Sequence, residues 1–258
     1  MISAVTIVST IDWYPFRPLL ESLAPVVDEI VVNVDAGAPK TLETVYQFMD
    51  EFPISVSVSA WNWAAKDRGG ELARQTNLAI NRATHDWILD VQADELLHED
   101  EHAELLRYVQ NAPDHISGFQ LDRLYFFGRP DILRTDWTVP LTRLFRKGSH
   151  TVVGDAMGTQ TLWGRVVPAH GVRLYHYSRL APGNQIVDRI MSLSRLFHEE
   201  STLERPETYD WKPRLFDTFS SDNRHEATEV DPEEVCVKFN GTHPRYVRSW
   251  LRQQLQGS

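Results

Sequence analysis

The stretch DWILDVQADELLHED, residues 86 to 100, places a hydrophobic run directly before a group of acids. The apolar residues of WILDV, residues 87–91, are typical of a buried strand. This run stops at Gln92-Ala93-Asp94-Glu95, and further acidic residues follow. A buried strand gains nothing from carboxylates unless they reach water, a cation or a metal. The stretch therefore predicts a strand whose end carries polar chemistry.

The residues before this stretch alternate between strand and helix patterns. Strands are predicted at 4–9, in EIVVNVDAG (29–37) and in ISVSVSA (54–60), where Ile54, Val56, Val58 and Ala60 alternate with small polar residues. Helical patterns follow each of them, starting near Pro15, at 41–50 and from Glu71, and a fourth helix begins with the acids at 99–101. This alternation predicts an α/β fold with a mostly parallel sheet between helices.

The pattern changes after about residue 115. The segments SGFQLDRLYFFG (117–128), LTRLFRKG (141–148) and GVRLYHYS (171–178) are expected to be longer strands with mixed faces. A helix is expected over about 184–199, and the polar segment 201–234 is expected to be rich in loops. We therefore expect one domain with a second half of different strand character.

Composition limits the class of protein. The chain has 258 residues, 42% of them hydrophobic, and a formal net charge of −10, which argues against binding bare nucleic acid over its whole surface. Cys236 is the only cysteine, so an internal disulfide is impossible and a reducing cytoplasm is the simplest expectation. The first residues, MISAVTIVSTIDW, lack the pattern of a signal peptide, and no run of about 18 apolar residues predicts a membrane span.

Several common catalytic motifs are missing from the sequence. It has no G-x-G-x-x-G dinucleotide fingerprint and no G-x-x-x-x-G-K-[ST] phosphate loop. It also lacks a G-x-S-x-G nucleophile elbow and an H-E-x-x-H zinc helix. Three predicted strands nevertheless end in polar residues, after Ser9, at Asp35 and at Gln92, and ligands of open α/β sheets bind at such strand ends. What remains is a nucleotide site without a glycine-rich loop, beside carboxylates that could hold a divalent cation.

The sequence resembles the GT-A-fold glycosyltransferases of the large inverting family 2. The resemblance is carried by RQTNLAINRATHDWILDVQADE (74–95), where members commonly have an Arg/Asn-bearing helix, "gdWil" and an aspartate-rich "DADE". Further matches are VVNVDAG (31–37), FFGRP with RLFRKG (126–148), RLYHYSR (173–179) and FNGTHP (239–244). The resemblance implies a GT-A, Rossmann-like sheet. It divides the domain into a nucleotide-sugar half, 1–115, and an acceptor-side half with a C-terminal elaboration, 116–258.

The same resemblance implies a nucleotide-diphosphate sugar donor, most often a UDP-sugar, and a hydroxyl acceptor whose identity it leaves open: glycan, lipid-linked sugar, protein, small molecule or modified DNA base. Matched residue by residue, the family's donor-binding positions fall on Thr10, Asp12, Asp35, Arg74, Asn77 and Gln92.

A divalent metal, Mn²⁺ or Mg²⁺, is also implied. Its expected ligands are Asp94 and His176, helped by Glu95. The chain departs from the family at Gln92, where an aspartate is usual, and a neutral amide offers an oxygen but no charge. Asp94 would then carry most of the metal binding.

Inverting transfer requires a carboxylate that removes the proton of the acceptor hydroxyl. Asp155, in the glycine-flanked loop HTVVGDAMG, is the first candidate, and Asp136 beside Trp137 is the second. Each can instead be a turn aspartate.

Structural alternatives stay open for the other residues. Asp94 and Glu95 can cap a turn and helix, Asp35 can belong to an Asp-Ala-Gly turn, and His176 can be a buried structural histidine. At the level of function, the alternatives are a non-catalytic nucleotide- or sugar-binding relative and a nucleotidyltransferase. The latter needs a basic glycine-rich loop after its first strand, and STIDWYPF (9–16) is not one.

Overall fold

The computed structural model describes residues 1–12, 14–62, 70–136, 138–154, 156, 158–180 and 235–256. Its first half alternates strands and helices, as the sequence predicts. In chain order these are β1 (Ile2–Val8), α1 (Phe16–Leu23), β2 (Glu29–Asp35), α2 (Pro39–Phe48), β3 (Ile54–Ser59), α3 (Gly70–Arg82), β4 (Trp87–Asp90) and α4 (His102–Asn111). Between β4 and α4 lie the short strand β5 (Glu95–Leu96) and the 3-10 turn η1 (Glu99–Glu101).

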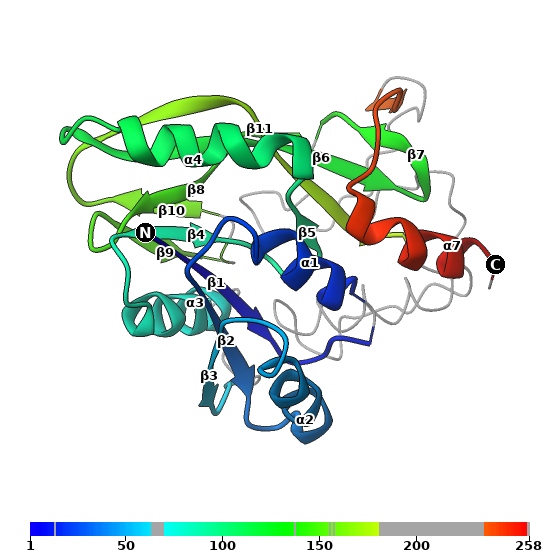
Figure 1. Cartoon of the computed structure of the whole chain (residues 1–258), viewed down its shortest axis with the longest axis horizontal. Coiled ribbons are helices and arrows are strands. Elements are labelled where there is room, and N and C mark those ends of the chain that lie inside the picture. Colours follow the sequence, from blue (N-terminus) through cyan, green and yellow to red (C-terminus); the bar gives the residue numbers. More distant parts are fainter. Residues whose placement is uncertain are drawn as a thin grey trace, which may run out of the picture.

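One large mixed sheet organises the molecule (Figure 1). Its parallel part has the order β3-β2-β1-β4, in which Val8 pairs with Val34 and Val5 with Asp90. Because these strands are parallel, their carboxyl ends all lie at one edge. That edge is where polar residues follow β1, β2 and β4.

The second half extends the sheet with mainly antiparallel strands. These are β6 (Ile116–Phe127), β7 (Arg129–Arg134), β8 (Leu141–Arg146), β11 (Arg165–Arg179) and β12 (Cys236–Lys238). Strand β8 joins β4 to β6, and β11 pairs in parallel with β6 and antiparallel with β5. A separate hairpin is formed by β9 (His150–Val153) and β10 (Gly158–Thr161). The turn η3 (Arg245–Val247) and helix α7 (Arg248–Gln256) follow β12.

Helices cover both faces of the sheet, as predicted. Leucines of α1 and α4, such as Leu20 and Leu105, pack with Ala4 and Leu89 on one face. On the other face, Ala79 and Ile80 of α3 pack with residues that include Ile88 of β4. All these side chains are at most 5% exposed, so each face forms a closed apolar layer.

Two details of the prediction are wrong. In β3, Val58 is 39% exposed while Ser57 is 2% exposed, so the expected apolar face is not the only buried one. Ser57 can be buried because its hydroxyl donates to the buried side-chain oxygen of Asn33, so the polar group keeps a hydrogen bond. The acids at 99–101 form the η1 turn, and α4 begins only at His102. The helix predicted over 184–199 and the loop-rich segment 201–234 lie outside the described residues.

Candidate functional site

Most of the predicted site residues lie along the carboxyl edge of the parallel strands. Thr10 and Asp12 follow β1, Asp35 is the last residue of β2, and Asp94 follows β4. The parallel register places these strand ends next to one another. The structure therefore brings together, at the location where open α/β sheets bind ligands, residues far apart in sequence.

Asp94 and His176 face each other at the centre of this edge. The distance from His176 Nε2 to Asp94 Oδ1 is 3.5 Å, and the two side chains are 6% and 12% exposed respectively. Their strands are held in register because the Tyr177 amide donates to the Asp94 carbonyl at 2.9 Å, and His176 pairs with Glu95. An oxygen and a nitrogen donor thus converge from two strands.

Tyr125, Ser178 and Arg179 surround His176. The rings of Tyr125 and His176 lie 4.5 Å apart, and the Tyr125 hydroxyl accepts from the Ser178 hydroxyl at 2.9 Å and from Arg179 Nε at 3.3 Å. None of these three was singled out from the sequence. For Ser178 and Arg179 the available signal was the match RLYHYSR, in which residues 176 and 178 share one side of a strand. Tyr125 lies outside this match, in SGFQLDRLYFFG.

Glu95, next to Asp94 in the chain, lies in a buried group of charges. Its side chain is fully buried, with Oε1 3.7 Å from Arg143 Nη2 and 3.9 Å from Arg123 Nη1. Its second oxygen, Oε2, accepts a hydrogen bond from the main-chain amide of Gln92 at 2.9 Å. The carboxylate is therefore engaged by guanidinium groups and by the turn after β4, and its part in metal binding stays a prediction.

Arg143 links Glu95 to a further buried acid, Asp90. Arg143 Nη1 donates to Asp90 Oδ2 at 2.7 Å, and both side chains are at most 5% exposed. Burial raises the pKa of Asp90, although the attraction of Arg143 opposes this rise. Burial alone would lower the pKa of Arg143, but the facing Glu95 and Asp90 carboxylates raise it. This pairing supports the strand end that carries Asp94.

Asp35 closes a tight turn at the end of β2. Its Oδ1 accepts from the Gly37 amide at 3.0 Å, its carbonyl accepts from the Ala38 amide, and the residue is 5% exposed. Thr10 and Asp12 form a local pair after β1, with the Thr10 hydroxyl 3.3 Å from Asp12 Oδ2. The turn role of Asp35 is thus observed, and the contact of all three with a nucleotide stays a prediction.

Arg74 and Asn77 project from α3 in different directions. Arg74 donates through two nitrogens to Glu71 at 2.7 Å and through Nη2 to the Ala60 carbonyl at 3.1 Å, at the edge where β3 ends. Asn77 instead binds the main chain of Val152 in β9, with its amide group donating at 2.8 Å and its oxygen accepting at 3.0 Å. Arg74 therefore lies at the candidate site, whereas Asn77 holds the β9–β10 hairpin against α3.

A buried network of side-chain amides joins β2 to α3 near the carboxyl edge of the sheet. Asn33 Nδ2 donates to Gln75 Oε1 at 2.8 Å, and both residues are fully buried. Gln75 Nε2 donates to Glu71 Oε1 at 2.7 Å. Gln75 was not among the predicted site residues, because a polar residue on a helix is expected to face solvent. Hydrogen bonding to Arg74 is the largest of the effects that lower the pKa of Glu71 to about 2.

The two candidate bases differ in what the structure describes. Asp155 lies outside the described residues. Asp136 accepts two hydrogen bonds, at 2.7 and 2.8 Å, from the almost fully buried Arg134. This fork pairing is typical of a structural ion pair. A role of Asp136 as base stays a prediction that requires this pair to open.

Two features are absent from the described part of the chain. No group of three or more His, Cys, Asp or Glu side chains there is arranged to hold a metal ion. Likewise, none of its helices combines the length and the apolar character needed to cross a membrane.

Comparison with known proteins finds solved structures that resemble this chain at low sequence identity. No protein-family model and no curated protein matches the chain. Among solved structures, S. aureus TarS 1–349 has 14% sequence identity and a TM-score of 0.45, covering 76% of this chain and 64% of that one. The same TarS fragment in complex with UDP-GlcNAc gives 14% identity, a TM-score of 0.45 and coverages of 76% and 66%. This chain thus spans less than two thirds of the length of these neighbours.

Proposed function

We propose that the protein is a GT-A glycosyltransferase that moves a sugar from a nucleotide-diphosphate donor to a hydroxyl acceptor with inversion. One observation carries the proposal: Asp94 and His176 converge at the carboxyl edge of the parallel strands, 3.5 Å apart. Asp35 and Thr10 follow the neighbouring strands at the same edge. The motif resemblance of residues 74–95 to family 2 supports the same activity.

The donor set at this edge fits a divalent cation. Asp94 supplies a carboxylate oxygen and His176 an imidazole nitrogen, and both side chains are largely buried. Divalent cations in transferases are commonly held by one or two protein ligands together with phosphates of the substrate. The imidazole favours Mn²⁺ over Mg²⁺, which is more strictly an oxygen-seeking ion. When bound, the ion would supply charge that stabilises the leaving diphosphate.

The surrounding residues would orient this pair and the donor. Glu95 is not needed as a metal ligand in this proposal, because its oxygens face Arg143, Arg123 and the main-chain amide of Gln92. Arg179 donates to the hydroxyl of Tyr125, whose ring packs against His176, and it would add positive charge near a diphosphate. Asp35 would face the nucleoside at the end of β2. Deprotonation of the acceptor is assigned to a carboxylate, with Asp155 as first candidate and Asp136 as second.

Binding without turnover is the second candidate function, and two observations favour it. Gln92 replaces the usual first acid of the motif, and Asp136 is held in a two-bond ion pair with Arg134. A protein of this kind would bind the nucleotide sugar at the same edge but would lack an effective base.

A donor panel separates the two functions. Thermal shift with UDP, GDP, CDP and dTDP, each with and without Mn²⁺, identifies the nucleotide. Release of that nucleoside diphosphate from its sugar conjugates, across a panel of hydroxyl acceptors, then measures transfer. Asp94→Asn is the test variant, and Asp86→Asn, at the opposite end of β4, is the matched control. Transfer that is lost only in Asp94→Asn supports the proposal. Binding without transfer favours the second function, and the absence of any binding refutes both.

A further inference from the structure

Strand β11 presents different chemistry on its two sides. In the register of β5, β6 and β11, His176 lies beside Glu95 and Tyr125, on the side of the candidate site. Tyr175 and Tyr177 point to the other side, because successive residues of a strand alternate. There they pack with Leu96 and Phe126 in a separate apolar cluster. Strand β11 therefore connects the candidate site to the residues that pack on its opposite side.

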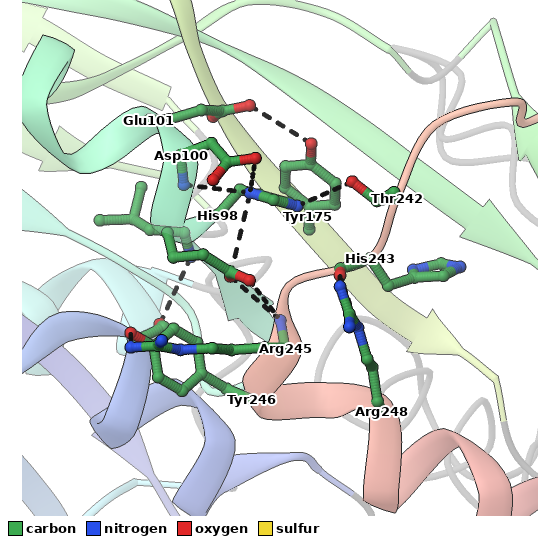
Figure 2. Close-up of polar contacts among 12 residues, drawn as sticks. His98, Asp100, Glu101, Tyr175, Thr242, His243, Arg245, Tyr246 and Arg248 are labelled. Atoms are coloured by element: carbon green, nitrogen blue, oxygen red, sulfur yellow. Dashed lines mark hydrogen bonds and ion pairs between the residues drawn. The ribbon is translucent and has the colours of Figure 1, made fainter.

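The C-terminal segment Phe239–Leu251 covers that opposite side (Figure 2). The Arg245 amide donates to both oxygens of Glu99, and the Arg248 guanidinium donates to the His243 carbonyl. His98 Nδ1 accepts from the Asp100 amide, so its Nε2 carries the proton and donates to the Thr242 hydroxyl at 3.1 Å. These bonds fix the segment against η1, and they leave His243 directed toward β6 and β11.

His243 uses both ring nitrogens in this position. Nε2 lies 2.9 Å from the Pro130 carbonyl, which can only accept, so Nε2 carries the proton. Nδ1 then accepts from the Tyr177 hydroxyl at 3.0 Å. Burial of the imidazole lowers the pKa of His243, which favours its neutral form. The imidazole also packs on Phe126 at 4.7 Å between ring centroids.

Tyr177 joins His243 to the candidate site within one residue. Its hydroxyl binds His243, and its main-chain amide donates to the Asp94 carbonyl at 2.9 Å. Its ring is fully buried and stacks on Phe126 at 4.9 Å, which leaves little freedom to absorb a displacement. A shift of the hydroxyl is therefore passed to the main chain that positions Asp94 and the adjacent His176.

We propose that His243 is a positioning residue for the site: it fixes Tyr177, and through the Tyr177 amide it sets the placement of Asp94 relative to His176. The structural part of this inference stands on the contacts alone. Its consequence for ligand binding rests on the proposed function.

The structural part is tested by amide exchange in the full chain without ligand. His243→Leu and Tyr177→Phe each remove the hydroxyl bond, and Tyr177→Phe keeps the stacked ring. Thr242→Val is the matched control, because it removes one bond of the same segment without touching Tyr177. Exchange of the amide of residue 177 should accelerate on the order of fivefold in both test variants but not in the control. The Val91 amide, bonded to Val5 in the sheet, should stay unchanged in all three.

The opposite results are equally defined. Unchanged exchange at residue 177 in both test variants overturns the inference. Equal acceleration at residue 177 and Val91 also overturns it, because it means general destabilisation. If His243→Leu does not fold, Tyr177→Phe decides alone. Partial recovery in His243→Asn, whose side-chain oxygen can accept from Tyr177, further supports positioning.

The binding part uses UDP with Mn²⁺ as the probe. Affinity for UDP should fall on the order of fivefold in His243→Leu and in Tyr177→Phe, and it should stay unchanged in Thr242→Val. The double variant Asp94→Asn with His243→Leu should bind UDP as tightly as Asp94→Asn alone. An equal fall with and without Asp94 shows that His243 does not act through it. If the native chain binds no nucleoside diphosphate, the proposed function fails, and the amide exchange still decides the role of His243.

Discussion

Replacing Arg143 by methionine tests the buried charges beneath the candidate site. The change removes the partner of Asp90 at 2.7 Å and the nearer partner of Glu95 at 3.7 Å, while Arg123 remains 3.9 Å from Glu95. Asp90 thus becomes a buried carboxylate without its cation. Removing one partner of a buried ion pair costs about 3–5 kcal/mol, and because Arg123 still compensates Glu95, we expect about 3 kcal/mol. Urea unfolding followed by tryptophan fluorescence measures this loss.

The size of the loss should depend on the charge of Asp90. In Arg143→Met the folded-state pKa of Asp90 rises further above its unfolded value, so its ionisation destabilises the fold as pH rises through that folded pKa. The gap in unfolding free energy between native and variant chains should therefore narrow as pH falls to about 4. Adding Asp90→Asn should recover part of the loss at pH 7.

Arg146→Met, on the same strand, is the matched control for this experiment. Arg146 donates to the carbonyls of Ile116 and Ala112 and lies over the Trp87 ring, without a carboxylate partner among these contacts. We expect a loss of about 1 kcal/mol. A loss below about 1 kcal/mol for Arg143→Met, or no recovery with Asp90→Asn, would refute the view that these charges are mutually dependent.

Two further predictions concern stability. The Arg74 hydrogen bonds are the main cause that lowers the pKa of Glu71 to about 2 in the folded protein. The ionised Glu71 therefore stabilises the fold at pH values above its unfolded pKa of about 4.5, and this stabilisation is lost as the pH falls toward 2. Glu71→Gln should remove this pH dependence, on the order of 1–2 kcal/mol because Arg74 is 50% exposed, as measured by urea unfolding between pH 2 and 6. Gly164→Ala should destabilise the fold by about 3–5 kcal/mol, since its φ is +78° and a Cβ would lie 2.4 Å from Ser117 Cβ. Gly148→Ala, with the same φ but open space, should cost only about 1–2 kcal/mol, and equal losses would contradict the steric explanation.

The parallel half of the fold is predictable because its signals are local. Apolar runs such as EIVVNVD and WILD are buried on both faces, and each is separated from the next by a helical pattern. Contacts between distant residues are not local. Ser57 is buried because Asn33 accepts from it, and Gln75 because Asn33 and Glu71 bind it, and neither residue carries that information in its own neighbourhood.

The site shows the same division. Its location at Asp94 follows from an apolar strand that ends in acids, and the RLYHYSR match pointed to His176. The sequence could not show that Glu95, next to Asp94, points to Arg143 and Arg123, because that depends on the pairing of β5 with β11. The docking of His243 on Tyr177, 66 residues apart, was equally hidden.

Calorimetric titration of UDP, with and without Mn²⁺, tests the central claim most directly. It should be carried out on the native chain, on Asp94→Asn and on the control Asp86→Asn. We expect Mn²⁺ to tighten UDP binding at least about tenfold in the native chain and in Asp86→Asn, and to have little effect in Asp94→Asn. UDP affinity that is independent of both Mn²⁺ and Asp94 would contradict a metal-assisted diphosphate site at this edge of the sheet.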